Sequence, residues 1–164
     1  MTDFETIIGY TPGVIGRIAE LHALHYSREW GFDHYFEGKV ASELSGFINR
    51  YDDSRDRIWS LKVNSSIEAS ITIDSSSEEP GIAHLRWFIV SEKMKGTGTG
   101  NHLMKQAIDF CYDMRFKKVY LWTFQGLEPA RHLYQKFGFE LVEELEGSQW
   151  GTTVIEQRYE LIVS

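Results

Sequence analysis

Residues 83–101 read Ala-His-Leu-Arg-Trp-Phe-Ile-Val-Ser-Glu-Lys-Met-Lys-Gly-Thr-Gly-Thr-Gly-Asn, and this stretch decides the fold. Its first eight residues, Ala83 to Val90, form an apolar run of the length expected for a buried strand. Three glycines in five residues, Gly96, Gly98 and Gly100, then let the backbone curl with its N–H groups pointing one way. Beyond them, apolar residues recur at helical spacing: Leu103, Met104, Ala107, Ile108, Cys111 and Met114. The predicted order is strand, glycine turn, helix.

A glycine turn that opens a helix is suited to phosphate, because the free N–H groups and the positive end of the helix dipole face the same point. Two nucleotide motifs do not fit here. A Walker loop requires Lys-Ser or Lys-Thr after its last glycine, whereas Asn101-His102 follow Gly100. A dinucleotide fingerprint requires glycine at Asn101 and an acid closing the next strand, yet Lys117 to Phe124 ends without one. The alternative to a phosphate site is a plain exposed glycine connection.

Two separated motifs carry a resemblance to a known family. Lys95, Gly98 and Gly100 resemble the pyrophosphate loop of the Gcn5-related N-acetyltransferases (GNAT), in which Arg or Gln is followed by two free positions, Gly, one free position, and Gly or Ala. Residues 130–139 resemble that family's other signature, a short helix with a tyrosine that closes on Gly-Phe. From His84 to about Tyr159 the chain looks like acetyltransferase domains fused elsewhere to MarR-type regulators, here without a regulator half.

The resemblance implies acetyl-CoA as co-substrate, no metal, and a cofactor site along the strand and turn. The residues it places at the cofactor are Phe88, Ile89, Val90, Lys95, Gly96, Thr97, Gly98, Thr99, Gly100, Asn101 and Tyr134. Lys95 stands where the family has Arg or Gln, so it supplies charge without a planar fork. Tyr134 stands at the position of the proton donor to the departing thiolate, with a core aromatic as the alternative. Leu127 stands where the family often has Asn.

No motif fixes the group that removes a proton from the acceptor ammonium. The candidates are carboxylates and imidazoles: Glu29 and His25 first, then Glu20, Glu92 and His84. By resemblance, the predicted connection from Tyr26 to Tyr35 covers the acceptor pocket, and its aromatics and acids suit a cation; the alternative is an amphipathic loop over the core. His22 and His25 are three residues apart on a predicted helix but have no third ligand at zinc-like spacing, so we predict no metal site.

Composition bounds the class of protein. A chain of 164 residues with 42% hydrophobic content predicts one domain over residues 1–164. No apolar run is long enough to span a bilayer and the first residues lack the basic start of a signal peptide, so we expect a cytoplasmic protein without a membrane partner. The net charge of −7 argues against nucleic acid. The single cysteine, Cys111, lies on an apolar helix face and is predicted to be a packed thiol.

Lysines make the turn locally basic on an acidic protein. Lys93, Lys95 and Lys105 occur between residues 93 and 108 with no acid. This contrast suits an anionic cofactor and a cationic acceptor, whereas the alternative is that the acidic balance serves solubility alone.

The remaining pattern predicts an α/β fold with a mixed (α+β) sheet in the order β-α-α-β-β-β-α-β-α-β-β, a GNAT-like acyl-CoA N-acyltransferase fold. A strand from Phe4 to Tyr10 precedes a helix that starts at Thr11-Pro12, with an apolar stripe at Val14, Ile15, Ile18, Leu21 and Leu24. A second helix carries Phe36, Val40, Leu44, Phe47 and Ile48. A hairpin turns at Asn64-Ser65, a short helix follows Pro129, and strands at 139–144 and 152–162 end the chain.

The family resemblance implies that strands 83–90 and 117–124 splay apart, so that cofactor and acceptor enter the cleft from opposite sides. Two functions from different classes follow. The first is an N-acetyltransferase acting directly on a primary amine of a small molecule or peptide; the second is a non-catalytic acyl-CoA-binding module. A homodimer through the last two strands is left open.

Overall fold

The computed structural model describes residues 4–164, which form one seven-stranded sheet in the order β1-β2-β3-β4-β5-β7-β6 with four α-helices. The strands are β1 (Phe4–Ile8), β2 (Arg57–Val63), β3 (Ser66–Asp74), β4 (Ile82–Val90), β5 (Lys118–Phe124), β6 (Glu140–Gly147) and β7 (Val154–Ile162). The helices are α1 (Val14–Trp30), α2 (His34–Asn49), α3 (Thr99–Asp113) and α4 (Glu128–Lys136), with a 3₁₀ turn η1 (Glu92–Met94) before α3. The predicted element order and mixed sheet are confirmed, and η1 is added.

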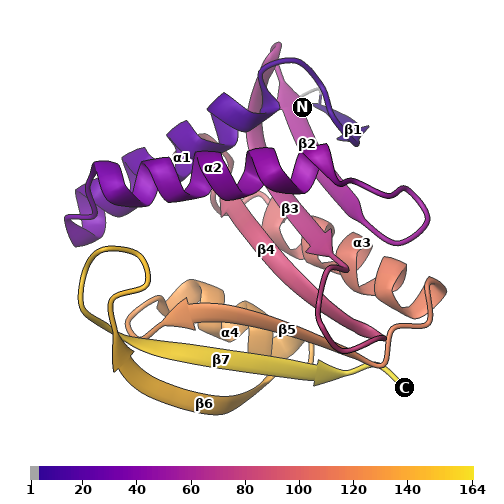
Figure 1. The fold of residues 1–164 in the computed structure, drawn as a ribbon. Coiled ribbons are helices and arrows are strands. Elements are labelled where there is room, and N and C mark those ends of the chain that lie inside the picture. The colour runs from indigo at the N-terminus through magenta and orange to yellow at the C-terminus, as the bar shows by residue number, and fades with distance from the viewer. Residues whose placement is uncertain (1–3) are drawn as a thin grey trace.

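Helices cover both faces of strands β2 to β4 (Figure 1). On one face, Ile18 of α1 and Leu44 of α2 pack with Ile89 of β4. On the other face, Leu103 of α3 packs in the same apolar cluster as Leu85 of β4. Leu85 and Ile89 are four residues apart and would share a face in a regular strand, so their opposite layers reflect an irregularity of β4 between them.

Strands β4 and β5 part soon after they meet. They are the parallel pair of this sheet, and their register covers only Ile82↔Lys118, Ala83↔Val119 and His84↔Tyr120. Beyond His84, β4 keeps its antiparallel partner β3 but has no β5 partner (Figure 1). The wedge that the resemblance implied is present, and it leaves one backbone edge of β4 unpaired.

A β-bulge lies on β4 beside the wedge. The register with β3 jumps from Thr72↔Arg86 to Ser70↔Ile89, so Trp87 and Phe88 together face one β3 residue. Trp87 has a φ of 47°, which a bulky residue rarely adopts. The bulge sends the Trp87 ring toward α1 and α2 and the Phe88 ring toward α3.

The predicted connection from Tyr26 to Tyr35 is wrong over most of its length, because α1 continues to Trp30 and only residues 31–33 connect it to α2. Gly31 ends the helix in the left-handed region (φ 70°); its N–H donates to the carbonyl of Ser27, and the N–H of Phe32 donates to the carbonyl of Tyr26. The polar and aromatic residues after Tyr26 belong to the last turns of a helix whose apolar face is buried, while its outer face meets solvent.

Smaller corrections concern the ends and faces of elements. β1 ends at Ile8, and α1 starts after Gly13 (φ 92°) instead of at Thr11-Pro12. Leu24, which the predicted stripe included, is 60% exposed. Cys111 is fully buried, and burial raises the pKa of its thiol to about 12, which confirms a packed thiol.

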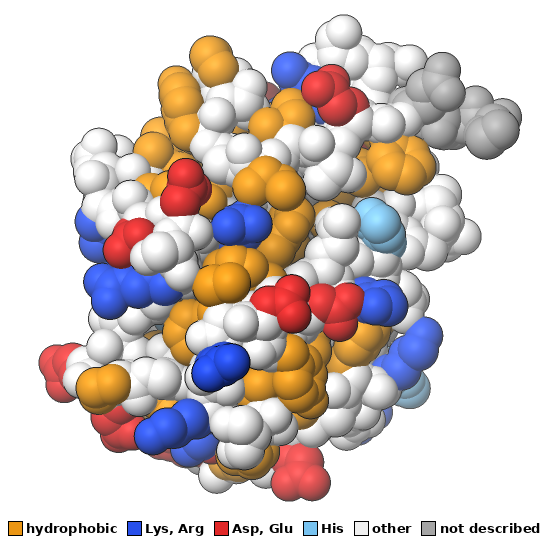
Figure 2. All heavy atoms as spheres, turned by 90° about the vertical axis from the view of Figure 1, so that its right-hand side faces the viewer, with side chains coloured by type: hydrophobic (Ala, Val, Ile, Leu, Met, Phe, Trp, Pro, Cys, Tyr) orange, Lys and Arg blue, Asp and Glu red, His pale blue; other side chains and the backbone are white. Residues whose placement is uncertain are grey.

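The described residues contain no helix that could cross a membrane and no group of three His, Cys, Asp or Glu side chains placed to hold a metal. On the face seen in Figure 2, Lys and Arg lie among Asp and Glu, and hydrophobic side chains separate them.

Candidate functional site

The glycine turn has the backbone that an anion site needs. Gly96 (φ 75°) and Gly98 (φ 83°) lie in the left-handed region, and Gly98 is the N-cap of α3 with no side-chain cap. The first N–H groups of α3, on Thr99, Gly100 and Asn101, lack intrahelical partners by the geometry of any helix start. A Cβ placed on Gly96 or Gly98 would meet nothing within 4 Å. The turn therefore has both free donors and open space for a diphosphate.

The charges around the turn are more balanced than the sequence suggests. Lys95 Nζ donates to Glu92 Oε1 at 2.7 Å, Lys93 lies 3.8 Å from Glu68, and Lys105 donates to Asp109 at 2.6 Å. Lys136 of α4 also lies at the turn, which the sequence analysis did not predict. Its Nζ donates to Asn101 Oδ1. This contact joins residues 35 positions apart and brings the second motif onto the turn.

A cavity of about 150 Å³ lies where β4 and β5 part. We call it the central cavity. Aromatic rings from distant segments dominate its wall: Tyr26, Phe32, Phe36, Trp87, Phe88, Trp122, Phe124, Tyr134 and Trp150. Phe88 also links it to the turn, since a Cβ on Gly100 would lie 3.4 Å from the Phe88 ring.

Tyr134 projects from α4 into the central cavity and is 7% exposed. Burial, with the neighbouring Tyr26 and Tyr159 hydroxyls, holds the pKa of its phenol well above the ordinary value. Tyr134 packs against Phe139 and Tyr159 with ring centroids 6.1 and 5.9 Å apart. The side chain is thus part of the core and also reaches the cavity, and its phenol is protonated at neutral pH; its role as proton donor stays a prediction.

The three predicted β4 residues point to different places. Phe88 lines the central cavity, Ile89 is buried against α1 and α2, and Val90 lines a second cavity of about 480 Å³. Their shared feature is the backbone, because the unpaired edge of β4 begins after His84.

The candidate bases lie mostly away from the central cavity. His25 lines the second cavity, with its Nδ1 3.5 Å from Glu92, which also holds Lys95. Glu29 is on the outer face of α1, 53% exposed and 3.8 Å from Arg28. Glu20 pairs with Arg17.

Among the five candidates, only His84 lines the central cavity, where it stacks on Tyr120 with centroids 4.3 Å apart. Burial and the nearby Arg86 lower the pKa of His84 to about 3, so its imidazole is neutral and weakly basic.

His22 lines the central cavity and is a residue that the sequence analysis weighed only as a metal ligand. Its Nδ1 lies 2.8 Å from the carbonyl oxygen of Ile18. The structure separates it from His25, which lines the other cavity. The available signal was its spacing, since His22 follows Ile18 by four residues and precedes Tyr26 by four on the buried face of α1.

The chain matches a known protein family. The model of the "Acetyltransferase (GNAT) family" matches residues 15–139. The spermine/spermidine N(1)-acetyltransferase of Bacillus subtilis is 26% identical over 126 residues, a match that covers 74% of this chain and 65% of that relative, just under two thirds of its length.

Solved structures agree in fold. A GNAT-family acetyltransferase from Staphylococcus aureus superposes with a TM-score of 0.78 at 17% identity, covering 99% of this chain and 100% of that one. One from Streptococcus pneumoniae has a TM-score of 0.74 at 19% identity, covering 98% and 100%.

Proposed function

Because the chain belongs to the acetyltransferase (GNAT) family, we propose that it is an acetyl-CoA-dependent N-acetyltransferase acting on a primary amine of a small molecule or peptide. The observation that carries this proposal is the contact between the turn and the cavity. Gly100, in the first turn of α3, lies against Phe88, which lines the central cavity. An anion site and a reaction chamber are therefore continuous. The finer likeness to domains fused to MarR-type regulators stays a prediction.

The residues present fit the cofactor. The first N–H groups of α3 are free, an added Cβ on Gly98 beside them would meet nothing within 4 Å, and Lys95 and Lys136 bring positive charge to a diphosphate. When bound, acetyl-CoA supplies the acetyl thioester. The unpaired edge of β4 beyond His84 supplies N–H donors that polarise the thioester carbonyl, and one such donor is worth about 3 kcal/mol.

Tyr134 has the role of proton donor to the departing sulfur. Its raised pKa keeps the phenol protonated across the range in which a thiol, with a pKa of about 8.5, ionises. It lines the same central cavity as Phe88, which supports this role.

His22 is our candidate for the group that accepts a hydrogen bond from the reacting amine. A carbonyl oxygen can only accept, so the contact with Ile18 requires the proton on Nδ1 and leaves the Nε2 lone pair free. Burial lowers the pKa of His22 to about 4, which keeps the ring neutral at physiological pH. The neutral ring then serves as a fixed hydrogen-bond acceptor for the amine, and it is a weak base by itself.

The alternative remains a non-catalytic acyl-CoA-binding module, favoured by Lys95 and Leu127 at positions where the family has other residues. Binding of acetyl-CoA cannot distinguish the two, whereas release of CoA in the presence of an amine can. The test measures free thiol with acetyl-CoA and a panel of polyamines, amino acids, aminoglycosides and lysine peptides. Amine-dependent thiol release supports the enzyme; binding by calorimetry without release from any amine supports the module.

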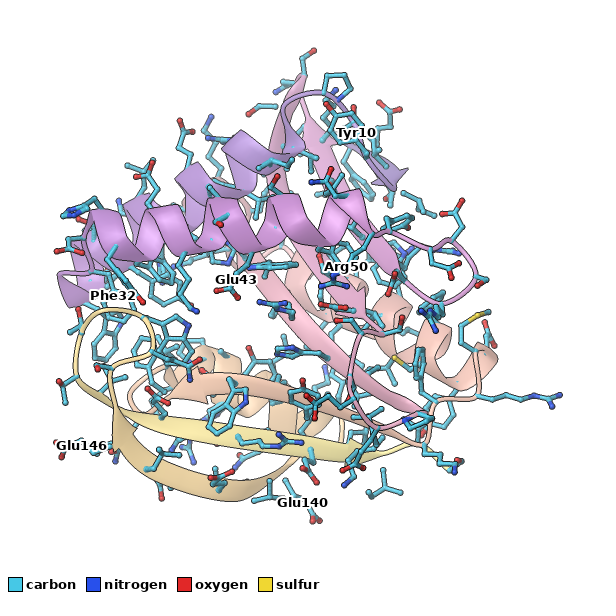
Figure 3. The ribbon with its side chains drawn as sticks, in the orientation of Figure 1. Tyr10, Phe32, Glu43, Arg50, Glu140 and Glu146 are labelled. Carbon is cyan, nitrogen blue, oxygen red and sulfur yellow. The ribbon has the colours of Figure 1, made fainter. Side chains whose placement is uncertain are left out.

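A homodimer and a cytoplasmic location also stay predictions. β6 is the outer strand of the sheet, Leu141, Val142 and Leu145 on it are more than 40% exposed, and Glu140 and Glu146 mark its two ends (Figure 3). Sedimentation velocity over a range of concentrations measures whether a second copy covers this strand.

A further inference from the structure

A cluster of five charged side chains lies beside the central cavity, and Arg86 is its centre. The Arg86 guanidinium donates to Glu43 of α2 and, at 3.1 Å, to Asp74 of β3. Lys39 pairs with Glu43 one turn away, and Arg50 donates two hydrogen bonds of 2.8 Å to Asp74. Figure 3 shows Glu43 on α2 and Arg50 at the end of that helix, where Arg50 is the C-cap. Three of the five, Lys39, Glu43 and Arg86, line the cavity wall.

Cations outnumber acids in this cluster. Each of its two carboxylates already contacts two cations, so three positive side chains face two negative ones. Although burial opposes ionisation, the hydrogen bonds from Arg50 keep the pKa of Asp74 well below its ordinary range. His22 and His84, which also line the cavity, are neutral. The cavity wall therefore carries one acid, Glu43, which contacts two cations, Lys39 and Arg86. Together these three side chains leave one net positive charge on the wall.

The Arg86 side chain is held in a fixed position. Its guanidinium lies over the Trp87 ring, 4.1 Å from the centroid, and its side chain is 18% exposed. Two of its five N–H donors are accounted for by Glu43 and Asp74. A stacked guanidinium with donors to spare suits a carboxylate or a similar oxyanion better than an ammonium.

Elsewhere the cavity wall is mainly aromatic and carries no further acid, and the nearby Glu156 carboxylate already accepts hydrogen bonds. Glu156 is 5% exposed and accepts from the backbone N–H of Gln149 at 3.0 Å and from its side-chain amide at 2.9 Å. Gln149 lies between this carboxylate and the cavity, whose wall includes Gln149 but not Glu156. The rings of Phe32, Phe124 and Trp150 form the neighbouring surface.

We propose that the acceptor is a monoamine with an apolar, ring-sized body and one anionic oxygen group, held by Arg86 and Lys39, and that linear polyamines are poor acceptors. The inference rests on the proposed function and narrows its substrate class. A polyamine would bring several ammonium groups to a cavity with no uncompensated acid on its wall, whereas an amino acid brings one charge of each sign. The Bacillus subtilis relative is a spermine/spermidine N(1)-acetyltransferase, so we expect the two proteins to differ in acceptor.

The first experiment compares matched acceptors on the unmodified protein. Tryptophan and tryptamine share a ring and an amine and differ in the carboxylate, as do phenylalanine and phenethylamine; spermidine completes the panel. We expect kcat/KM from CoA release to be about tenfold or more higher for the member that carries the carboxylate, the effect of one charge-assisted contact. Spermidine is expected to be the poorest acceptor.

The second experiment changes the cluster at Lys39, which pairs with Glu43 and not with Asp74. Lys39→Met removes one cation and leaves the Asp74 contacts in place, so the ratio of kcat/KM for tryptophan over tryptamine should fall about fivefold or more. Lys62→Met is the matched control, because Lys62 is on β2 and does not line the cavity. The control should keep the ratio.

The outcomes separate the two proposals. If spermidine equals or exceeds tryptophan, or if Lys39→Met leaves the ratio unchanged, the anionic acceptor is wrong while the acetyltransferase activity stands. If no amine gives CoA release, the proposed function fails and this inference fails with it.

Discussion

The Nδ1 of His22 lies 2.8 Å from the carbonyl oxygen of Ile18, one turn earlier in α1. This single contact decides which nitrogen of a buried imidazole carries the proton, and it orients the other nitrogen on a side chain that lines the central cavity. The backbone of a helix thus sets the chemistry of a side chain on the same helix.

His22→Asn removes the ring and should lower kcat by about tenfold or more, the size of one lost hydrogen bond to the reacting amine, with acetyl-CoA affinity nearly unchanged. Steady-state CoA release and calorimetry measure the two quantities. His132→Gln is the control, because His132 is an exposed residue of α4. A normal kcat for His22→Asn removes His22 from the mechanism.

Tyr134→Phe keeps the ring in the core and deletes the proton donor. We expect kcat to fall by about a hundredfold, with the affinity for acetyl-CoA and the unfolding midpoint nearly unchanged, since the packing on Phe139 and Tyr159 is kept. The readouts are CoA release, calorimetry and thermal unfolding. An unaltered kcat would assign Tyr134 to the core alone.

Gly98→Glu should abolish acetyl-CoA binding, because a carboxylate would stand at the start of α3 where the diphosphate is expected, on a backbone with φ 83° that side chains rarely adopt. Gly16→Ala is the matched control. Gly16 lies in α1, is not among the positive-φ glycines, and has no atom within 4 Å of an added Cβ, so alanine there should be neutral or stabilising by about 0.5 kcal/mol. Retained binding by Gly98→Glu in calorimetry refutes the site.

Acidification should destabilise the protein below about pH 6.5, where unfolded histidines begin to bind protons. Burial lowers the folded-state pKa of His84 to about 3 and of His22 to about 4, so the unfolded state takes up protons first and the stability that these neutral rings contribute is lost as pH falls. The free energy of unfolding should fall by roughly 1 kcal/mol per pH unit for each histidine between pH 6 and 4.5.

Urea unfolding of the wild type and of His84→Gln at pH 7, 5.5 and 4.5 checks this dependence. The free energy of unfolding of the variant should fall less steeply with decreasing pH, because one of the two buried histidines is gone. If the free energy of unfolding has the same pH dependence in both proteins, His84 does not contribute to the acid sensitivity.

A feature could be predicted from the sequence when the residues that determine it are close together in the chain. The strand, turn and helix around Gly98 were predictable, because glycine is the residue that adopts a positive φ and the helix start follows directly. The continuation of α1 to Trp30 was not, since it depends on Tyr26 and Phe32 packing on Phe124 of β5, nearly a hundred residues on. Tertiary burial of an aromatic overrides a polar local pattern.

The charged cluster lay beyond sequence reasoning for a related reason. Arg86 and Glu43 are 43 residues apart and have no motif of their own, and Arg86 reaches α2 partly because the bulge at Trp87 places two successive β4 side chains on one face. Register irregularities of this kind have no signature in the pattern of apolar residues.

Three residue pairs join β4 to β5, so widening the far end of the central cavity breaks no main-chain ladder there. The width of the chamber is set by side chains such as Phe88 and Leu121, which line it from the two strands. Exchanging Phe88, which is only partly buried, can admit a bulkier or slimmer amine without breaking the β4–β5 ladder, which makes the choice of acceptor easy to alter, by evolution or by engineering, on an unchanged scaffold.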